Sequence, residues 1–149
     1  MIMVDGMVSF CGHIKDGIHR LAVRVYYAET DFSGIVYHSR YLEFLERGRT
    51  EFLRLADIHH HELAGGKYGE LLAWVVRRLE IDFITPAHID DVLIIETGIE
   101  SVSGARINMQ QRIIHDGKLL GKARVKVALV NREGRPRRFP REWAERFQP

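Results

Sequence analysis

Residues 26–38 read YYAETDFSGIVYH and join two segments whose apolar residues repeat with different periods. The run Arg20–Tyr27 alternates apolar and polar side chains, which predicts a half-buried strand. From His38 to Ala56, apolar residues recur at steps of three and four, which predicts a long amphipathic helix. The stretch therefore places a turn that carries Asp31 and Gly34 at the start of a helix.

An acid in such a turn has a specific chemical use. The first backbone N–H groups of a helix are unpaired and carry a partial positive charge. A carboxylate beside them stays ionised, and a neighbouring N–H can stabilise a developing oxyanion. Asp and Ser are also ordinary turn residues, so Asp31 taken alone is better explained as a turn or helix cap.

The composition of the 149 residues fits one globular domain over residues 1–149, with 46% hydrophobic and 28% charged residues. A net charge of +2 is compatible with an anionic small molecule and gives little support to nucleic-acid binding. The single cysteine, Cys11, excludes an internal disulfide and suits a reducing compartment.

No apolar run approaches the ~18 residues of a membrane span, and the N-terminus lacks the pattern of a secretory signal. We therefore expect a cytoplasmic protein without a transmembrane segment. Residues 1–18 are expected to form a flexible leader.

The second half of the chain predicts four further strands. They alternate apolar and polar residues at Ala73–Phe83, Asp91–Ser101, Arg106–His115 and Lys118–Val130. The Asp116–Gly117 pair between the last two is a strong hairpin signal. Residues 132–149 form a basic tail with a possible short helix at Pro140–Phe147.

The connection at residues 57–69 is polar, with a possible short helix at His61–Ala64. Its three consecutive histidines, 59–61, are better explained as a surface loop than as a metal site. Adjacent loop residues converge poorly on one ion, and no acid or cysteine stands at ligand spacing. We therefore predict no metal.

One long helix covers only one face of the expected five-stranded antiparallel sheet. The open edges of such a sheet are usually completed by another subunit, which predicts a homodimer or homotetramer. The fold class is α+β.

Several motifs spread over most of the chain carry a family resemblance, namely YAETDFSGIVYHSRY (27–41), FLERGRTE (44–51), WVVRR (74–78) and PAHIDD (86–91). They closely resemble acyl-CoA thioesterases of the 4-hydroxybenzoyl-CoA thioesterase type, and most of all the bacterial members associated with the Tol–Pal envelope system. The resemblance covers roughly Leu21–Pro140. It implies the hotdog fold, in which a long central helix is wrapped by the sheet.

The resemblance also implies residue roles. Asp31 is then the catalytic carboxylate, which either attacks the thioester carbonyl or activates a water molecule. At the position of His38, the backbone N–H polarises the thioester oxygen, a role better supported than acid–base chemistry by its imidazole. Tyr27 either positions Asp31 or water, or is a packed core tyrosine.

The substrate contacts are expected around the acid and at a more distant site. Residues near the acid that we expect to contact substrate are Gly34, Val36, Tyr37 and Tyr41. By resemblance, coenzyme A binds outside the pocket through its phosphates and adenine, with candidate contacts at Ser103, Arg106 and Arg138, and Arg137 as an alternative to Arg138. Coenzyme A belongs to the substrate, so no separate cofactor is expected.

The helix also carries Glu46, Arg49 and Glu51. They form either a polar seam, which lies near the site or near a subunit interface, or an ordinary surface ion pair. We interpret them as structural.

Two other functions compete with hydrolysis. A hotdog hydratase or dehydratase acting on an acyl thioester usually pairs a histidine with a carboxylate across the fold, whereas here His38 follows Asp31 by seven residues. The other is a non-catalytic module that binds an acyl carrier protein or an envelope partner. Its acidic partner would dock on the basic stripe Lys122, Arg124 and Lys126, which is otherwise an ordinary solvated face.

Overall fold

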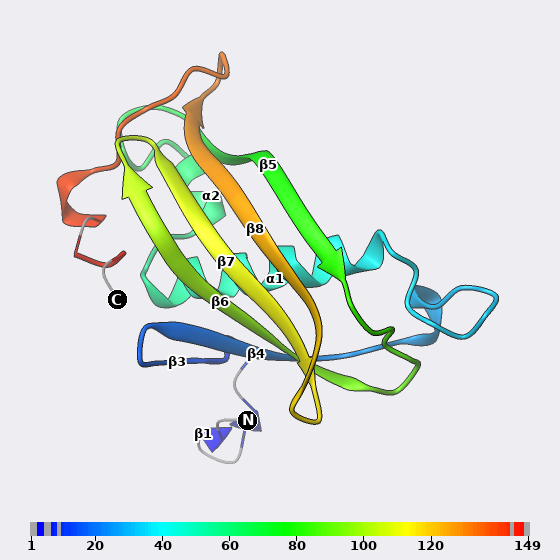
Figure 1. Cartoon of the computed structure of the whole chain (residues 1–149). Coiled ribbons are helices and arrows are strands. Elements are labelled where there is room, and N and C mark those ends of the chain that lie inside the picture. Colours follow the sequence, from blue (N-terminus) through cyan, green and yellow to red (C-terminus); the bar gives the residue numbers. More distant parts are fainter. Residues whose placement is uncertain (1–2, 5–6, 9, 144, 148–149) are drawn as a thin grey trace.

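The computed structural model describes residues 3–4, 7–8, 10–143 and 145–147. Its main feature is a six-stranded antiparallel sheet in the order β3-β4-β6-β7-β8-β5, with helix α1 across one face (Figure 1). The strands are β3 (His13–Lys15), β4 (Ile18–Arg24), β5 (Leu72–Phe83), β6 (Val92–Ser103), β7 (Arg106–His115) and β8 (Lys118–Asn131). The α+β class is confirmed.

The other elements are short apart from the central helix. They are α1 (Arg40–Leu55), α2 (His60–Ala64), the 3-10 helices η1 (Tyr27–Glu29) and η2 (Arg141–Trp143), and a separate hairpin of β1 (Met3–Val4) and β2 (Met7–Val8). In the described part of the chain, no helix is long and apolar enough to cross a membrane.

The prediction of five strands is wrong by one, because β3 adds a sixth strand at the edge beside β4. The predicted flexible leader, residues 1–18, therefore contains part of the sheet. The turn between the two strands holds Asp16 and Gly17 at φ values of 54° and 77°. An Asp-Gly pair in this conformation is the usual two-residue hairpin turn, so the sequence did carry the signal.

The first long strand ends three residues earlier than predicted, at Arg24. The backbone of Tyr26 donates to the Glu29 carboxylate at 2.7 Å, and this bond caps the η1 turn that follows. Tyr27 therefore leaves the sheet and is 82% exposed, so its interpretation as a packed core tyrosine is wrong.

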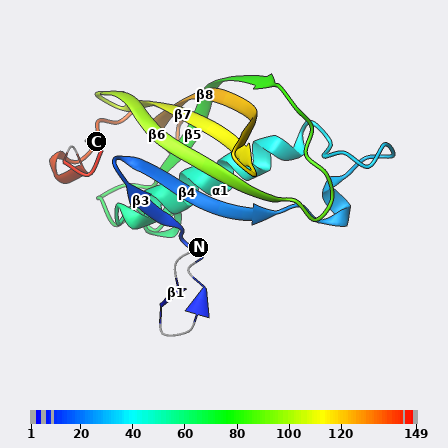
Figure 2. The same ribbon diagram turned by 60° about the horizontal axis from the view of Figure 1, so that its bottom comes forward.

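Helix α1 packs on the inner face of the sheet, closest to β4 and β6 (Figure 2). Gly48 faces the sheet, and a Cβ at this position would lie 2.8 Å from Ile95 Cγ2 and 2.9 Å from Thr97 Oγ1. The buried side-chain amide of Gln111 donates to the Leu45 carbonyl at 2.9 Å and to Thr97 Oγ1 at 3.0 Å. The hydrogen bonds of Gln111 and the absence of a Cβ at Gly48 together allow the helix to pack close to the sheet.

The C-terminal tail belongs to the core. Trp143 is fully buried and packs against the rings of Phe139 and Phe147, with Tyr68 and Trp74 completing an aromatic cluster. The described tail holds only the three-residue η2 in place of the possible helix over Pro140–Phe147.

We expect Gly48→Val to destabilise the protein by about 1–3 kcal/mol, because the new side chain would overlap the packed atoms of Ile95 and Thr97. Urea unfolding followed by circular dichroism measures this change. The exposed Arg47→Ala on the same helix serves as the control and should change stability by less than about 0.5 kcal/mol. Equal effects of both substitutions would show that the close approach at Gly48 is unimportant.

Candidate active site

The turn that carries Asp31 is closed by its own backbone. The Asp31 N–H donates to the Ile35 carbonyl at 2.8 Å, and the Gly34 N–H donates to the Asp31 carbonyl at 3.0 Å. Gly34 adopts φ 83°, a conformation that a residue without a Cβ reaches at little cost. The carboxylate is thus held at the tip of a short, self-contained loop.

Ser33 controls the charge on Asp31. Its backbone N–H and its hydroxyl donate to Asp31 Oδ1 at 2.8 and 2.5 Å. Hydrogen bonds to the charged form favour ionisation, and they lower the pKa of the Asp31 carboxyl below its usual value. The side chain is exposed to solvent, so the carboxylate is ionised at neutral pH.

A surface cavity of about 310 Å³ brings several of the predicted site residues together. Asp31, Val36, His38 and Tyr41 line it from the turn and the start of α1. The opposite wall, which the sequence did not single out as a site, is formed by residues 83–86 at the end of β5.

Tyr41 ties the two walls of this cavity together. Its hydroxyl accepts the Ala87 N–H at 3.0 Å, and its ring packs against Phe83 with centroids 5.5 Å apart. Because Tyr41 is itself buried on α1, it fixes the segment after β5 relative to the helix start.

Backbone N–H groups are free at the start of α1. The helix begins at Arg40, two residues after His38, and Ser39 is its N-cap without a side-chain capping bond. Tyr37 donates its N–H to the Glu29 carbonyl, and Arg40 donates to Tyr37. Within the described residues, no acceptor takes the N–H of His38. This group is therefore available to an oxygen atom of a ligand.

Other predicted site residues lie elsewhere. Tyr27, Gly34 and Tyr37 do not line the cavity, and Tyr27 points into solvent. Ser103 and Arg106 flank the β6–β7 turn, at the opposite end of the sheet from the Asp31 turn in both views (Figures 1 and 2). Arg138 lies beside them, since the next residue donates its N–H to the Gly104 carbonyl. In a single chain these candidate coenzyme A contacts therefore do not share the Asp31 cavity.

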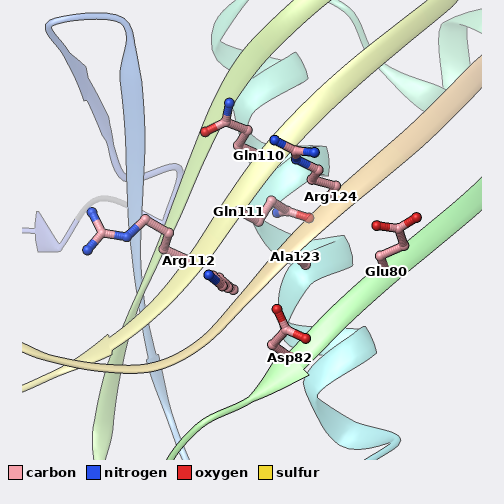
Figure 3. Close-up of a pocket in the computed structure, with 8 residues that line it drawn as sticks. Glu80, Asp82, Gln110, Gln111, Arg112, Ala123 and Arg124 are labelled. Atoms are coloured by element: carbon pink, nitrogen blue, oxygen red, sulfur yellow. The ribbon is translucent and has the colours of Figure 1, made fainter.

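The basic stripe of β8 lies on the outer face of the sheet, where a depression of about 360 Å³ is found (Figure 3). Glu80 and Asp82 line it on one side, and Arg124 lines it toward the other. The Arg112 guanidinium points away from it and pairs with Glu96 at 3.2 Å. Arg124 also pairs with Glu100 at 3.5 Å. The face carries both signs of charge, which weakens the case for docking of an acidic carrier.

The histidines at 59–61 make ordinary polar contacts. His59 lies 3.1 Å from Asp57, and His60 lies 3.1 Å from the Thr50 hydroxyl. Among the described residues, no group of three or more His, Cys, Asp or Glu side chains is arranged to hold a metal ion.

A family model described as the thioesterase-like superfamily matches residues 25–147. The chain belongs to the thioesterase-like superfamily. It is 45% identical over 121 residues to the acyl-CoA thioesterase YbgC of Haemophilus influenzae, covering 80% of this chain and 87% of the relative. It is 39% identical over 133 residues to the acyl-CoA thioester hydrolase YbgC of Escherichia coli O157:H7, covering 88% and 96%.

Solved structures agree with this assignment. A probable thioesterase from Bartonella henselae superposes with a TM-score of 0.81 at 53% identity, covering 83% of this chain and 99% of that one. A 1,4-dihydroxy-2-naphthoyl-CoA thioesterase from Synechocystis, at 23% identity, shares the fold with a TM-score of 0.79 over 88% and 96% of the chains. The predicted hotdog fold and the resemblance to acyl-CoA thioesterases are confirmed.

We expect Ser33→Ala to raise the pKa of Asp31, because it removes the hydroxyl that stabilises the charged carboxylate. The midpoint at which the carboxylate takes up a proton then moves to higher pH. Titration of the carboxyl carbon by NMR measures the shift. Thr30→Ala is the matched control, because the Thr30 hydroxyl donates to the Tyr27 carbonyl and not to Asp31. An unchanged midpoint in Ser33→Ala would contradict the assigned hydrogen bond.

Proposed function

We propose that this member of the thioesterase-like superfamily hydrolyses acyl-CoA thioesters to a free acid and coenzyme A. The observation that carries the proposal is that one cavity is lined both by Asp31, whose carboxylate is ionised, and by His38, whose N–H has no acceptor among the described residues. The names of the YbgC relatives support the choice of an acyl-CoA substrate.

The two groups divide the chemistry of thioester hydrolysis between them. The helix-start N–H donates to the carbonyl oxygen as it becomes negative, an interaction worth on the order of 3 kcal/mol per donor in other enzymes. The Asp31 carboxylate supplies the attack in one of two ways. It forms a mixed anhydride with the acyl group, releasing the coenzyme A thiolate before water hydrolyses the anhydride, or it removes a proton from an attacking water.

The imidazole of His38 has no hydrogen bond to Asp31 among the described contacts, and its ring packs instead against Tyr37 at 4.4 Å. A hydratase or dehydratase that acts on an acyl thioester usually pairs a histidine side chain with a carboxylate across the fold. The site therefore favours hydrolysis.

We further propose that two copies associate through the open edge of β5, a homodimer being one of the two assemblies that the sequence predicts. This strand pairs with β8 alone within the described sheet. Its inner face exposes 49% of Val76 and 53% of Phe83, apolar surface that a second copy would cover. Because Phe83 also lines the Asp31 cavity, a second copy at this edge would lie beside the site.

A reducing, cytoplasmic setting is also proposed, from the single free Cys11. Binding of an acyl carrier protein remains a proposal that rests on the basic stripe, and a Tol–Pal connection remains one that rests on the sequence resemblance.

We expect Asp31→Asn to lower kcat for acyl-CoA hydrolysis about a hundredfold or more, because the amide keeps the shape but neither attacks nor accepts a proton. Thiol release from short, long and aromatic acyl-CoAs measures this effect and ranks the acyl groups. Asp116→Asn, at an exposed hairpin turn with φ 49°, controls for the loss of one carboxylate and should keep full activity. Equally slow hydrolysis by wild type and Asp31→Asn would overturn the proposed function.

We expect Val76→Lys to shift the protein from dimer to monomer, because a charge would then enter the apolar β5 edge. Sedimentation velocity at several concentrations measures the assembly. Val102→Lys places the same charge on a valine of similar exposure in β6, and should leave the assembly unchanged. A monomeric wild type would contradict the proposed association.

A further inference from the structure

Arg49 is a buried cation that lacks a carboxylate partner. It is only 9% exposed, yet it belongs to none of the ion pairs in the described part of the chain. On the same helix, Arg40 pairs with Glu43 and Arg54 pairs with Glu51. Charged side chains are rarely buried unless they are paired, so Arg49 requires an explanation.

The guanidinium is fixed in one orientation by a buried amide. Arg49 Nη1 donates to Gln111 Oε1 at 2.9 Å, and Gln111 is held in turn by Leu45 and Thr97. This is the one hydrogen bond of the Arg49 side chain among the described contacts, although a guanidinium has five N–H donors. Most of its donor capacity is therefore unused.

Arg49 also lines a cavity. A volume of about 110 Å³ lies between α1, β5 and the inner face of the sheet, and Arg49 lines it. Its other walls are largely apolar, formed by Leu53, Trp74, Val76, Met109 and Val127. None of the Arg49 nitrogens is among the fully buried unpaired polar atoms of the described residues, so those without a bond keep some solvent-accessible surface.

Polar groups at the rim are already engaged with one another. The Thr50 hydroxyl donates its single proton to Glu46 at 2.7 Å, so His60 Nε2, 3.1 Å away, must donate to Thr50. Burial lowers the pKa of Arg49, and the negative charge of Glu46 partly opposes this shift. Arg49 stays protonated, because the ordinary pKa of a guanidinium lies far above neutral pH. The cavity therefore holds the positive charge of Arg49 between largely apolar walls, with the Glu46 carboxylate, already bonded by Thr50, also among its lining residues.

The Arg49 cavity and the Asp31 cavity lie along the same seam between α1 and β5. Tyr41 lines one and Arg49 the other, eight residues or about 12 Å apart along the helix. Between them on the inner face of β5, Leu79 and Ile81 are only partly buried. An acyl chain whose thioester lies at Asp31 could follow this apolar seam toward Arg49.

We infer that the Arg49 cavity is a subsite for a carboxylate at the far end of the acyl group, which makes acyl-CoAs of dicarboxylic acids a preferred substrate class. A planar guanidinium binds a carboxylate through two parallel hydrogen bonds, and the apolar walls suit the methylene chain. The inference rests on the proposed thioesterase function. A carboxylate from a second copy of the chain is the other source of the same chemistry.

The test compares octanoyl-CoA with suberyl-CoA, the eight-carbon acyl-CoA that ends in a carboxylate. We expect wild type to show the higher kcat/KM for suberyl-CoA, and Arg49→Met to lower the ratio of suberyl-CoA to octanoyl-CoA about tenfold by slowing suberyl-CoA far more than octanoyl-CoA. Arg49→Lys should restore part of the preference, because it returns the charge without the planar fork. Arg54→Met, on the same helix, should leave the ratio unchanged.

Wild-type inhibition provides a measurement that needs no substitution in the core. Free suberate should inhibit octanoyl-CoA hydrolysis more strongly than octanoate does. The subsite would be overturned by equal inhibition by the two acids, or by a suberyl-to-octanoyl ratio that Arg49→Met leaves unchanged. Hydrolysis of octanoyl-CoA would preserve the proposed function in either case. Loss of the dimer in Arg49→Met, without a suberyl preference in wild type, would assign the carboxylate to the second copy and overturn the inference. No thiol release from any acyl-CoA would instead defeat the function itself.

Discussion

The contact between Gln111 and helix α1 determines the position of almost everything near the site. One buried amide bonds to the Leu45 carbonyl of the helix, to Thr97 of the neighbouring strand and to Arg49, while Gly48 allows the backbone to approach. A helix held so firmly at its middle has little freedom at its start. Its first N–H groups are thus presented at a fixed place beside the sheet, and the acid-bearing turn is built onto that place.

The site combines a local part and a long-range part. The local part is the segment from Asp31 to His38, in which the acid and the unpaired N–H are seven residues apart. The long-range part is the wall after β5, which Tyr41 holds through the Ala87 N–H. The local part carries the groups proposed to react, and the long-range part adds the opposite wall of the cavity. The seam that continues toward Arg49 gives the same arrangement a means of selecting substrates.

The local features could be predicted from the sequence, because periodicity and turn chemistry act over a few residues. β7 has the predicted bounds, Arg106–His115, and the acid lies at the mouth of the helix as expected. What the sequence did not reveal depends on contacts between distant segments. The spacing of Glu46 and Arg49 allowed either a polar seam or an ordinary surface ion pair, whereas Arg49 is buried against Gln111 and forms no ion pair in the described part of the chain. Likewise, no local pattern indicates that Trp143 closes the core.

The partners of the Asp31 carboxylate have a consequence for how such proteins diversify. Among the described residues, the hydrogen bonds that lower its pKa come from Ser33, from the Ile35 backbone and from its own backbone, and the turn closes on itself at Ile35. The acidity of this group is therefore encoded in five consecutive residues and is insulated from the walls of the cavity. Substitutions along α1 or β5 can reshape the space for an acyl chain without retuning the acid. Selectivity and reactivity can then evolve as separate traits on one scaffold.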